Sequence, residues 1–458
     1  MKMIYDINDK PKPASLLILA LQQMLAILSA TIAVPLIIGN GLTPASAMFG
    51  AGIGTLVYLF FTRRKSPVFL GSSFAFIGSM SSAFAGAVSI KLGMLGLVIG
   101  ALAAGLVYVV LSFIVKLFGV GWINKLMPPI VIGPTVAIIG LSLAGSAVDN
   151  MQKGAFASTH NTSGSTYAAL ACALITLAVT LLCSTYAGRR LKLIPFVCGI
   201  LAGYAAASLF TVIGTAAGID SIKLVDFGIF KQTMFKDGFS AQTFFRVPDF
   251  VFIDAFKGFD ELDSSYIITV LIAYIPVAFV TFAEHIADHK NLSSVIGKDL
   301  LKDPGLPATL LGDGVGSIVG AFFGGCPNTT YGESVACVAI TKNASIITIF
   351  CAAIGCMLFS FVSVFVAFVS SIPPCVMGGV CVALYGFISV SGFKMFKHVD
   401  LDKSRNLFVA SVILVTGIGG LELSFGKVTV TNIALALILG ILTNLMLSRE
   451  KQDEQDQT

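Results

Sequence analysis

The stretches PVFLGSSFAF, residues 67–76, and FFGGCPNTTYGE, residues 322–333, decide how the fold is interpreted. Each lies in a strongly apolar part of the chain, yet each carries Gly, Ser, Thr or Pro where a membrane-spanning helix would be continuous. Irregular backbone at membrane depth is tolerated only where it lines a cavity or is buried in protein. The sequence therefore predicts two short extended segments, each followed by a half-helix whose free N–H groups face the centre of the bilayer.

The whole sequence has the composition of a membrane protein. Of its 458 residues, 56% are apolar and 12% are charged, and the mean hydropathy is +0.91. Soluble domains carry about 25% charged residues, so this chain lacks the charges to cover a soluble surface. Apolar runs long enough to cross roughly 30 Å of hydrocarbon recur about fourteen times. We therefore expect an all-α polytopic membrane protein with about fourteen transmembrane spans rather than a soluble enzyme.

The two interrupted segments occupy equivalent places in this series, because the first falls in the third span and the second in the tenth. Each is third in a block of seven, and consecutive blocks with an odd number of spans have opposite orientations in the membrane. Broken helices at corresponding places in two halves indicate an inverted-repeat transporter with a site near the bilayer midplane. The alternative is two ordinary re-entrant loops without a shared site.

The basic residues predict the orientation of the chain. Most of the 29 Lys and Arg residues, such as the cluster Arg63, Arg64 and Lys65, fall in cytoplasmic segments if the N-terminus is cytoplasmic, as the positive-inside rule requires. Both termini are then expected in the cytoplasm, and the net charge of +5 reflects orientation rather than a nucleic-acid partner. The polar residues 1–12 lack the layout of a cleaved signal peptide.

Metal and nucleophile motifs are missing from the sequence. Most of the nine cysteines lie inside apolar runs without a C-x-x-C pair, and the four histidines do not form a ligand cluster. We therefore expect no metal, no cofactor and no embedded hydrolase.

Ionisable residues inside apolar spans are the candidates for function, because charge at the bilayer centre is costly. Glu284, His285 and Asp288 end one long apolar run, and Glu333 lies in the second interrupted segment. On a helix, Glu284 and Asp288 share one face, and His285 projects about 100° away. His289 follows directly and is expected at the cytoplasmic interface.

Several motifs together resemble the nucleobase-ascorbate transporter family, with the closest likeness to its bacterial uracil-transporting branch. They are LQQMLAILSATIAVP (21–35), GSSFAF (71–76), AEHIADH (283–289), KDLLKDPGL (298–306), PNTTYGES (327–334) and PPCVMGG (373–379). Ser334 and Ala336 depart from the family signature, which usually has Asn and Gly there. Asp288 stands where some relatives have His.

The resemblance implies two inverted repeats of seven spans, divided between two domains. A core domain would comprise residues 1–127 and 263–372, and a gate domain residues 128–213 and 373–447. An external loop, 214–262, and a polar cytoplasmic tail, 448–458, would complete the chain. The protein would lie in the cytoplasmic membrane as a multi-pass permease, and the resemblance allows a homodimer.

The resemblance also implies proton-driven uracil import by alternating access. The substrate would be bound by Ala30, Phe74, Glu284, Tyr331, Gly332, Glu333 and Tyr385. Glu284 would carry the proton, supported by His285 and Asp288. This agrees with the chemistry of uracil, whose ring N–H groups need acceptors such as carboxylates and whose carbonyls need donors such as half-helix N–H groups.

Three alternatives remain at this stage. The substrate could be xanthine or urate, and the coupling ion could be sodium. An anion transporter or channel could share the inverted seven-span architecture, but it should place a basic residue or bare helix termini at the site. Glu284 and Glu333 argue against it.

Overall fold

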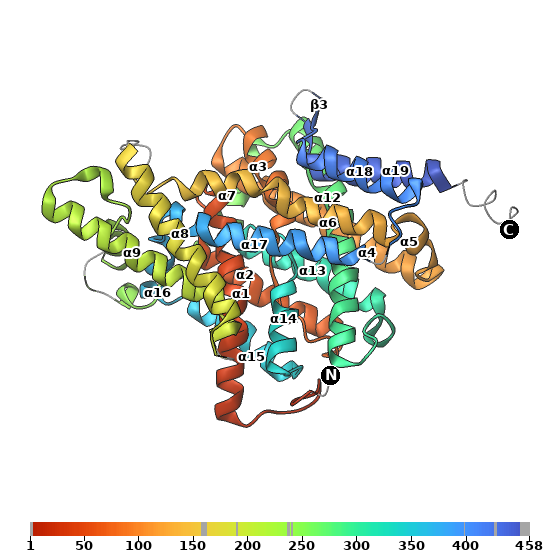
Figure 1. Ribbon diagram of the computed structural model, residues 1–458, viewed down its shortest axis with the longest axis horizontal. Coiled ribbons are helices and arrows are strands. Elements are labelled where there is room, and N and C mark those ends of the chain that lie inside the picture. Colours follow the sequence, from red (N-terminus) through yellow and green to blue (C-terminus); the bar gives the residue numbers. More distant parts are fainter. Residues whose placement is uncertain are drawn as a thin grey trace, which may run out of the picture.

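The computed structural model describes residues 3–156, 163–188, 191–235, 239, 241–397, 399–425 and 428–448. Helices dominate this part of the chain (Figure 1). Among the described residues, nine helices are long and apolar enough to cross a membrane, and five further apolar helices are shorter, fourteen in all. The prediction of about fourteen spans is therefore confirmed. The predicted tail lies outside the described residues from position 449 onward.

The first seven spans are followed by a long connecting region. They are α1 (Pro13–Ile38), α2 (Pro44–Phe61), β1 (Leu70–Ser72) with η1 (Phe74–Phe76) and α3 (Ile77–Gly86), α4 (Ile90–Phe118), α6 (Pro129–Ser142) continued by α7 (Ala144–Met151), α8 (Ser163–Thr185) and α9 (Pro195–Ala217). The short α5 (Gly121–Leu126) joins α4 to α6. The connecting region contains α10 (Gly228–Met234) and α11 (Val251–Ala255).

The second seven spans repeat this order. They are α12 (Ser264–Ile296), α13 (Leu306–Gly324), β2 (Asn328–Thr330) with α14 (Gly332–Thr341), α15 (Ile346–Phe359), α17 (Pro374–Met395), α18 (Ser404–Ile418) and α19 (Asn432–Met446). The short α16 (Ser363–Ser370) follows α15, and a hairpin of β3 (Leu423–Phe425) and β4 (Val428–Val430) precedes α19.

The helix contacts follow two groups that are equivalent in the two halves. In one group α2 packs on α13, α4 packs on α12 and α13, and α15 packs correspondingly on α1 and α2. In the other group α6 packs on α17, α8 packs on α9 and α17, and α18 packs correspondingly on α19 and α6. Exchanging the two halves leaves this contact pattern unchanged, as expected for two inverted repeats.

Small residues allow the closest of these contacts. A side chain at Gly54 of α2 would lie 2.7 Å from the carbonyl oxygen of Gly316 on α13 and 2.6 Å from Asn328 Nδ2. Small residues at helix interfaces let backbones approach within membranes, where no hydrophobic effect drives helices together. The α2–α13 contact thereby brings the two interrupted spans together.

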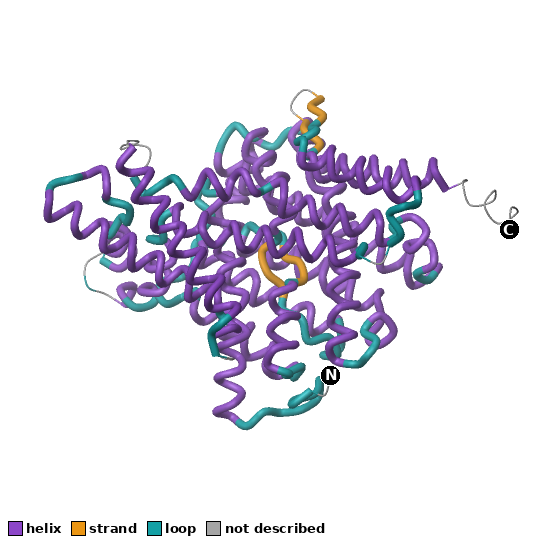
Figure 2. The backbone as a smooth tube through the Cα atoms, in the orientation of Figure 1, coloured by secondary structure: helices purple, strands orange, loops and turns teal. Residues whose placement is uncertain are grey.

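Both interrupted spans contain the predicted extended segment, and the two segments pair with each other. β1 and β2 form a two-stranded antiparallel sheet with Leu70 opposite Thr330 and Ser72 opposite Asn328 (Figure 2). Backbone groups outside this pairing are satisfied by side chains, since Leu70 N donates to Thr55 Oγ1 at 3.0 Å. The irregular backbone is thus hydrogen-bonded and buried in protein, which is the condition for its stability at membrane depth.

The helix that carries the predicted acids has clear signals at both ends. Tyr266 N donates to the side chain of Asp263 at 2.6 Å, which caps the start of α12. At its other end the chain turns at Gly297, which has a φ of 71°, a conformation that glycine adopts without strain. These signals fix the position of α12 along its axis.

The N-terminal residues before α1 lie against the segments that follow α12 and α14. Ala344 N donates to the carbonyl oxygen of Tyr5 at 2.9 Å. Lys298 Nζ lies 2.7 Å from Asp6 Oδ2, and Ile7 is buried. The N-terminal segment thereby connects loops at the ends of three spans.

Candidate functional site

A cavity lies where the β1–β2 sheet meets α6, α12 and α17. Its volume is about 50 Å³, well below the roughly 300–1,000 Å³ that is typical of small-molecule sites, so its walls lie close together in this structure. Its walls are Ser73, Phe74, Ala75, Val136, Ile139, Glu284, Ala287, Asp288, Thr329, Thr330, Tyr331, Gly332, Glu333, Phe387, Ile388, Ser391 and Met395.

The two interrupted spans form one wall of this cavity. Phe74 is the first residue of η1, and Gly332 and Glu333 are the first two residues of α14. The first N–H groups of α14 have no partner within their own helix, so this wall offers donors beside the Glu333 carboxylate. The Tyr331 hydroxyl donates to the Ser72 carbonyl oxygen at 2.7 Å, which holds its ring across the two segments.

The acids of α12 line the cavity beside this wall. Glu284 and Asp288, one helical turn apart, are both half-buried and line the cavity. Thr330 Oγ1 donates to Asp288 Oδ2 at 2.8 Å. The cavity therefore brings three carboxylates, including that of Glu333, together with free helical N–H groups.

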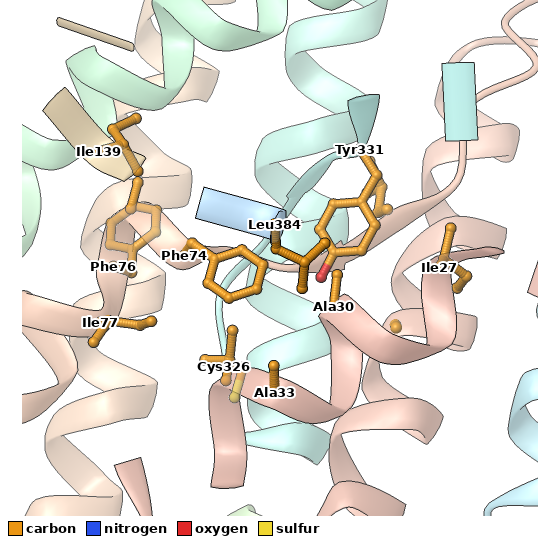
Figure 3. Packing of buried hydrophobic residues seen from close by; sticks show 14 of the residues in the cluster. Ile27, Ala30, Ala33, Phe74, Phe76, Ile77, Ile139, Cys326, Tyr331 and Leu384 are labelled. Atoms are coloured by element: carbon orange, nitrogen blue, oxygen red, sulfur yellow. The ribbon is translucent and has the colours of Figure 1, made fainter. Parts of the chain in front are cut away.

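Three of the predicted residues are not in the cavity wall. Ala30 is fully buried on α1, where the Tyr331 ring points toward it (Figure 3). Tyr385 on α17 is 2% exposed and meets the edge of the Phe74 ring, with ring centres 5.5 Å apart. These two residues pack behind the wall rather than in it.

His285, the third of these residues, points away from the cavity because it projects from another face of α12. Its Nδ1 lies 2.6 Å from Asp313 Oδ2 and its Nε2 lies 3.0 Å from Thr309 Oγ1, both on α13. Asp313 was missed by the sequence interpretation. The signal was available, since Asp313 is an acid within the apolar run that forms α13.

The expectation that His289 lies at the aqueous interface is wrong. His289 is fully buried, its Nδ1–H donates to the His285 carbonyl oxygen at 2.8 Å, and its Nε2 lies 2.7 Å from the Tyr58 hydroxyl. The helix continues to Ile296, so position 289 still packs against α2. Its hydrogen bonds offset the cost of burying the imidazole.

The chain was compared with known families and proteins. Residues 14–424 match the Permease family. The chain belongs to this family, the nucleobase-ascorbate transporters. It is 36% identical to the uracil permease of Bacillus subtilis (strain 168), over 99% of this chain and 98% of that protein. It is 38% identical to the uracil permease of Bacillus caldolyticus, over 98% and 96%.

Solved structures of transporters share the fold of this permease. The transmembrane domain of the cyanobacterial bicarbonate transporter BicA aligns with a TM-score of 0.61 at 13% identity, over 96% of this chain and 99% of that one. The murine Solute Carrier 26 family member A9 anion transporter, in its inward-facing state, aligns with a TM-score of 0.65 at 12% identity, over 97% and 69%. The prediction of two inverted seven-span repeats is confirmed.

Family membership settles the general class of the protein. It is a multi-pass permease of the cytoplasmic membrane, and it is a transporter rather than an enzyme.

At one departure from the family signature, Ser334 Oγ accepts hydrogen bonds from Gln23 Nε2 at 2.6 Å and from Phe69 N at 3.1 Å. The serine hydroxyl thus links α1 to both interrupted spans of this permease.

Proposed function

We propose that this permease imports uracil by proton symport. The observation that carries the proposal is the cavity itself, in which Glu284 and Glu333 face one space beside the free N–H groups of α14. The relatives at 36% and 38% identity are uracil permeases. Their near-complete overlap with this chain supports the same substrate.

The cavity offers partners that match the polar edge of uracil. The carboxylates of Glu284 and Glu333 accept from the ring N–H groups, and the N–H groups at the start of α14 donate to a carbonyl oxygen. Phe74 contributes an aromatic surface to the same wall. Gly332 leaves the backbone uncovered, so a planar ring can approach it closely.

Proton coupling is proposed at the acids of α12. Glu284 is the leading carrier and Asp288 supports it, because both carboxylates reach the cavity and therefore the water that brings the proton. His285 contributes indirectly through the α12 backbone, since its ring is engaged with Asp313. No other cofactor is proposed.

Alternating access is proposed to arise between the two groups of helices. The group built from α1–α4 and α12–α15 would act as the core, and the group built from α6–α9 and α17–α19 would act as the gate. The cavity lies between them, because α6 and α17 form the wall opposite β1, β2 and α14. Both termini are proposed to be cytoplasmic, and a homodimer is a further proposal.

An anion as substrate is not favoured by the cavity. The neighbouring folds include a bicarbonate and an anion transporter, but the likeness concerns the fold alone. Among the described residues that line the cavity there is no Lys, Arg or His, and there are three carboxylates. Such a wall repels small anions.

The test is uptake of labelled uracil into proteoliposomes with and without an inward proton gradient. We expect accumulation only with the gradient, no dependence on sodium, and competition by unlabelled uracil but not by xanthine. Accumulation driven by sodium alone would overturn the coupling, and competition by xanthine would overturn the substrate. Chloride or sulfate currents without uracil binding would overturn both.

A further inference from the structure

Thr330 joins β2 to α12 beside the cavity through one hydroxyl group. It is the last residue of β2, its backbone lies opposite Leu70 of β1, and its side chain is buried. Its Oγ1 donates to Asp288 Oδ2 on α12 at 2.8 Å. The next three residues, 331–333, all line the cavity. A single hydrogen bond thus connects an acid of α12 to the backbone of the tenth span, which lines the same cavity.

The second carboxylate oxygen of Asp288 reaches the start of α14. A side-chain carbon placed on Gly332 would lie 4.0 Å from Asp288 Oδ1, and apart from the adjoining residues of its own helix no other heavy atom lies within 4 Å of that position. Asp288 is therefore held by Thr330 through one oxygen, while its other oxygen lies beside the open face of Gly332.

The charged groups around Asp288 are carboxylates, whereas the titratable side chains of α2 and α4 that interact electrostatically with it, Tyr58 and Tyr108, are uncharged phenols. Glu284 lies one turn back on α12, Glu333 lies at the start of α14, and Asp313 is the nearest acid of α13. The residues of α6 and α17 that line the cavity carry no charge. No Lys, Arg or His belongs to the described wall of this cavity, so no side chain of the wall neutralises Asp288, and protonation would do so.

We propose that Thr330 is a positioning residue that makes the arrangement of the tenth span depend on the protonation of Asp288. This proposal rests on the proton-coupled uracil transport proposed above. It concerns how the proton and the substrate influence each other.

The chemistry of the two groups explains the link. An ionised carboxylate only accepts hydrogen bonds, so Thr330 must donate to it. When Asp288 takes a proton from a hydronium ion in the cavity water, an O–H bond forms on the carboxyl group, an O–H bond of the hydronium ion breaks, and a neutral water molecule remains. The carboxylic acid can then donate, and the Thr330 hydroxyl can accept from it and turn its own proton toward another acceptor. The charge-assisted hydrogen bond that fixed β2 is lost in this exchange.

The backbone that follows Thr330 transmits this change. Tyr331 and Gly332 are its immediate neighbours, and α14 begins at Gly332. A change in the hydrogen bond between Thr330 and Asp288 therefore alters the position of the free N–H groups of α14 and of Glu333 relative to the substrate. Protonation of Asp288 then changes the affinity for substrate, and substrate binding changes the affinity of Asp288 for the proton by the same factor, as coupled transport requires.

The test compares Thr330→Val, which removes the hydroxyl at similar size, with Thr330→Ser, which restores it. Full-length protein in proteoliposomes is assayed for uracil exchange without a gradient, for accumulation with an inward proton gradient, and for the pH dependence of uracil binding. In Thr330→Val we expect the ratio of accumulation to exchange to fall about tenfold, the effect of one lost charge-assisted hydrogen bond. The pH dependence should flatten, and Thr330→Ser should restore both.

The matched control is Thr341→Val at the other end of α14. The Thr341 hydroxyl donates to the Cys337 carbonyl oxygen within the same helix, at 2.7 Å. This variant should behave as wild type in all three assays. Asp288→Asn should reproduce the loss of coupling, and adding Thr330→Val to it should cause little further loss, because each change alone already removes the charge-assisted, protonation-dependent form of this hydrogen bond.

Three outcomes would overturn the proposal. The first is an equal fall of exchange and accumulation in Thr330→Val with an unchanged pH dependence, which indicates a purely structural role. The second is wild-type coupling in Thr330→Val. The third is additive loss in the double variant with Asp288→Asn. Absence of uracil binding by the wild type is a different result, and it would instead overturn the proposed function.

Discussion

The substitution Gly332→Ala tests whether substrate approaches the start of α14. The added methyl group would meet only Asp288 Oδ1, at 4.0 Å, so it points into the cavity without striking the protein. Alanine is also the better helix former, by about 1 kcal/mol in a helix interior. We therefore expect normal expression and an unchanged or slightly higher melting temperature.

Uracil binding should nevertheless weaken in this variant. The methyl group stands where the ring would contact the first N–H groups of α14, and loss of one hydrogen bond costs about 0.5–1.5 kcal/mol. This corresponds to a rise in Kd of about two- to tenfold. Gly332→Val, which fills more of the cavity, should weaken binding further while the protein remains folded.

The assay is uracil binding to purified protein, with melting temperature measured on the same samples. Gly386→Ala is the matched control, because a side chain at this exposed glycine of α17 also meets no atom within 4 Å. It should leave the Kd unchanged. An unchanged Kd in Gly332→Ala, or an equal rise in Gly386→Ala, would refute the proposed contact with the start of α14.

Three further predictions follow from the same arrangement. Glu284→Gln keeps the shape of the side chain but cannot titrate, so uracil exchange should persist while proton-driven accumulation disappears; a variant that still concentrates uracil would place the proton carrier elsewhere. Glu333→Ala removes a charge-assisted acceptor, at a cost of roughly 1.5–3 kcal/mol, so affinity should fall about ten- to a hundredfold. A uracil analogue methylated at the matching ring nitrogen should lose a similar factor on the parent protein and little more on the variant, whereas full additivity would show that Glu333 does not touch that edge. The hydrogen bond from Lys298 lowers the pKa of Asp6. The contribution of this ion pair to the stability of the fold is therefore fully present above the ordinary carboxyl pKa of about 3.9. It is lost as the pH falls through the lowered pKa of Asp6. As the pH is lowered from 7 to 3, the melting temperature should therefore fall slightly less in Asp6→Asn than in the parent, because the pair is half-exposed and its contribution is small. Identical curves for the two proteins would show that this ion pair does not contribute to stability.

The sequence predicted the interrupted spans because they break a rule that is local. Gly71 and Pro327 stand in apolar runs where a continuous helix would be expected, and membrane backbone has few alternatives to a helix. The pairing of β1 with β2 could not be predicted in the same way. It depends on α2 and α13 packing together across residues that are far apart in the chain.

The residues that line the cavity could be predicted where they carry charge and were missed where they are apolar. Glu284 and Glu333 were conspicuous because acids are costly in a membrane. Phe387 and Met395, which complete the cavity wall from α17, are indistinguishable in the sequence from other apolar residues of a span. The buried position of His289 depends on the hydroxyl of Tyr58, on another helix.

The distribution of polar groups between the two walls bears on how such a cavity could open and close. The acids and free N–H groups belong to α12, β2 and α14, whereas α6 and α17 contribute Val136, Ile139, Phe387, Ile388 and Met395, with Ser391 as the polar member. Apolar contacts are non-directional, so one apolar wall can shift across another without breaking a fixed set of hydrogen bonds. A wall of salt bridges would have to be dismantled in each cycle, at a cost of several kcal/mol where the charges are buried. Keeping the charges on one side would therefore let the proposed substrate site stay intact while the other side moves, as the proposed alternating access around a single site requires.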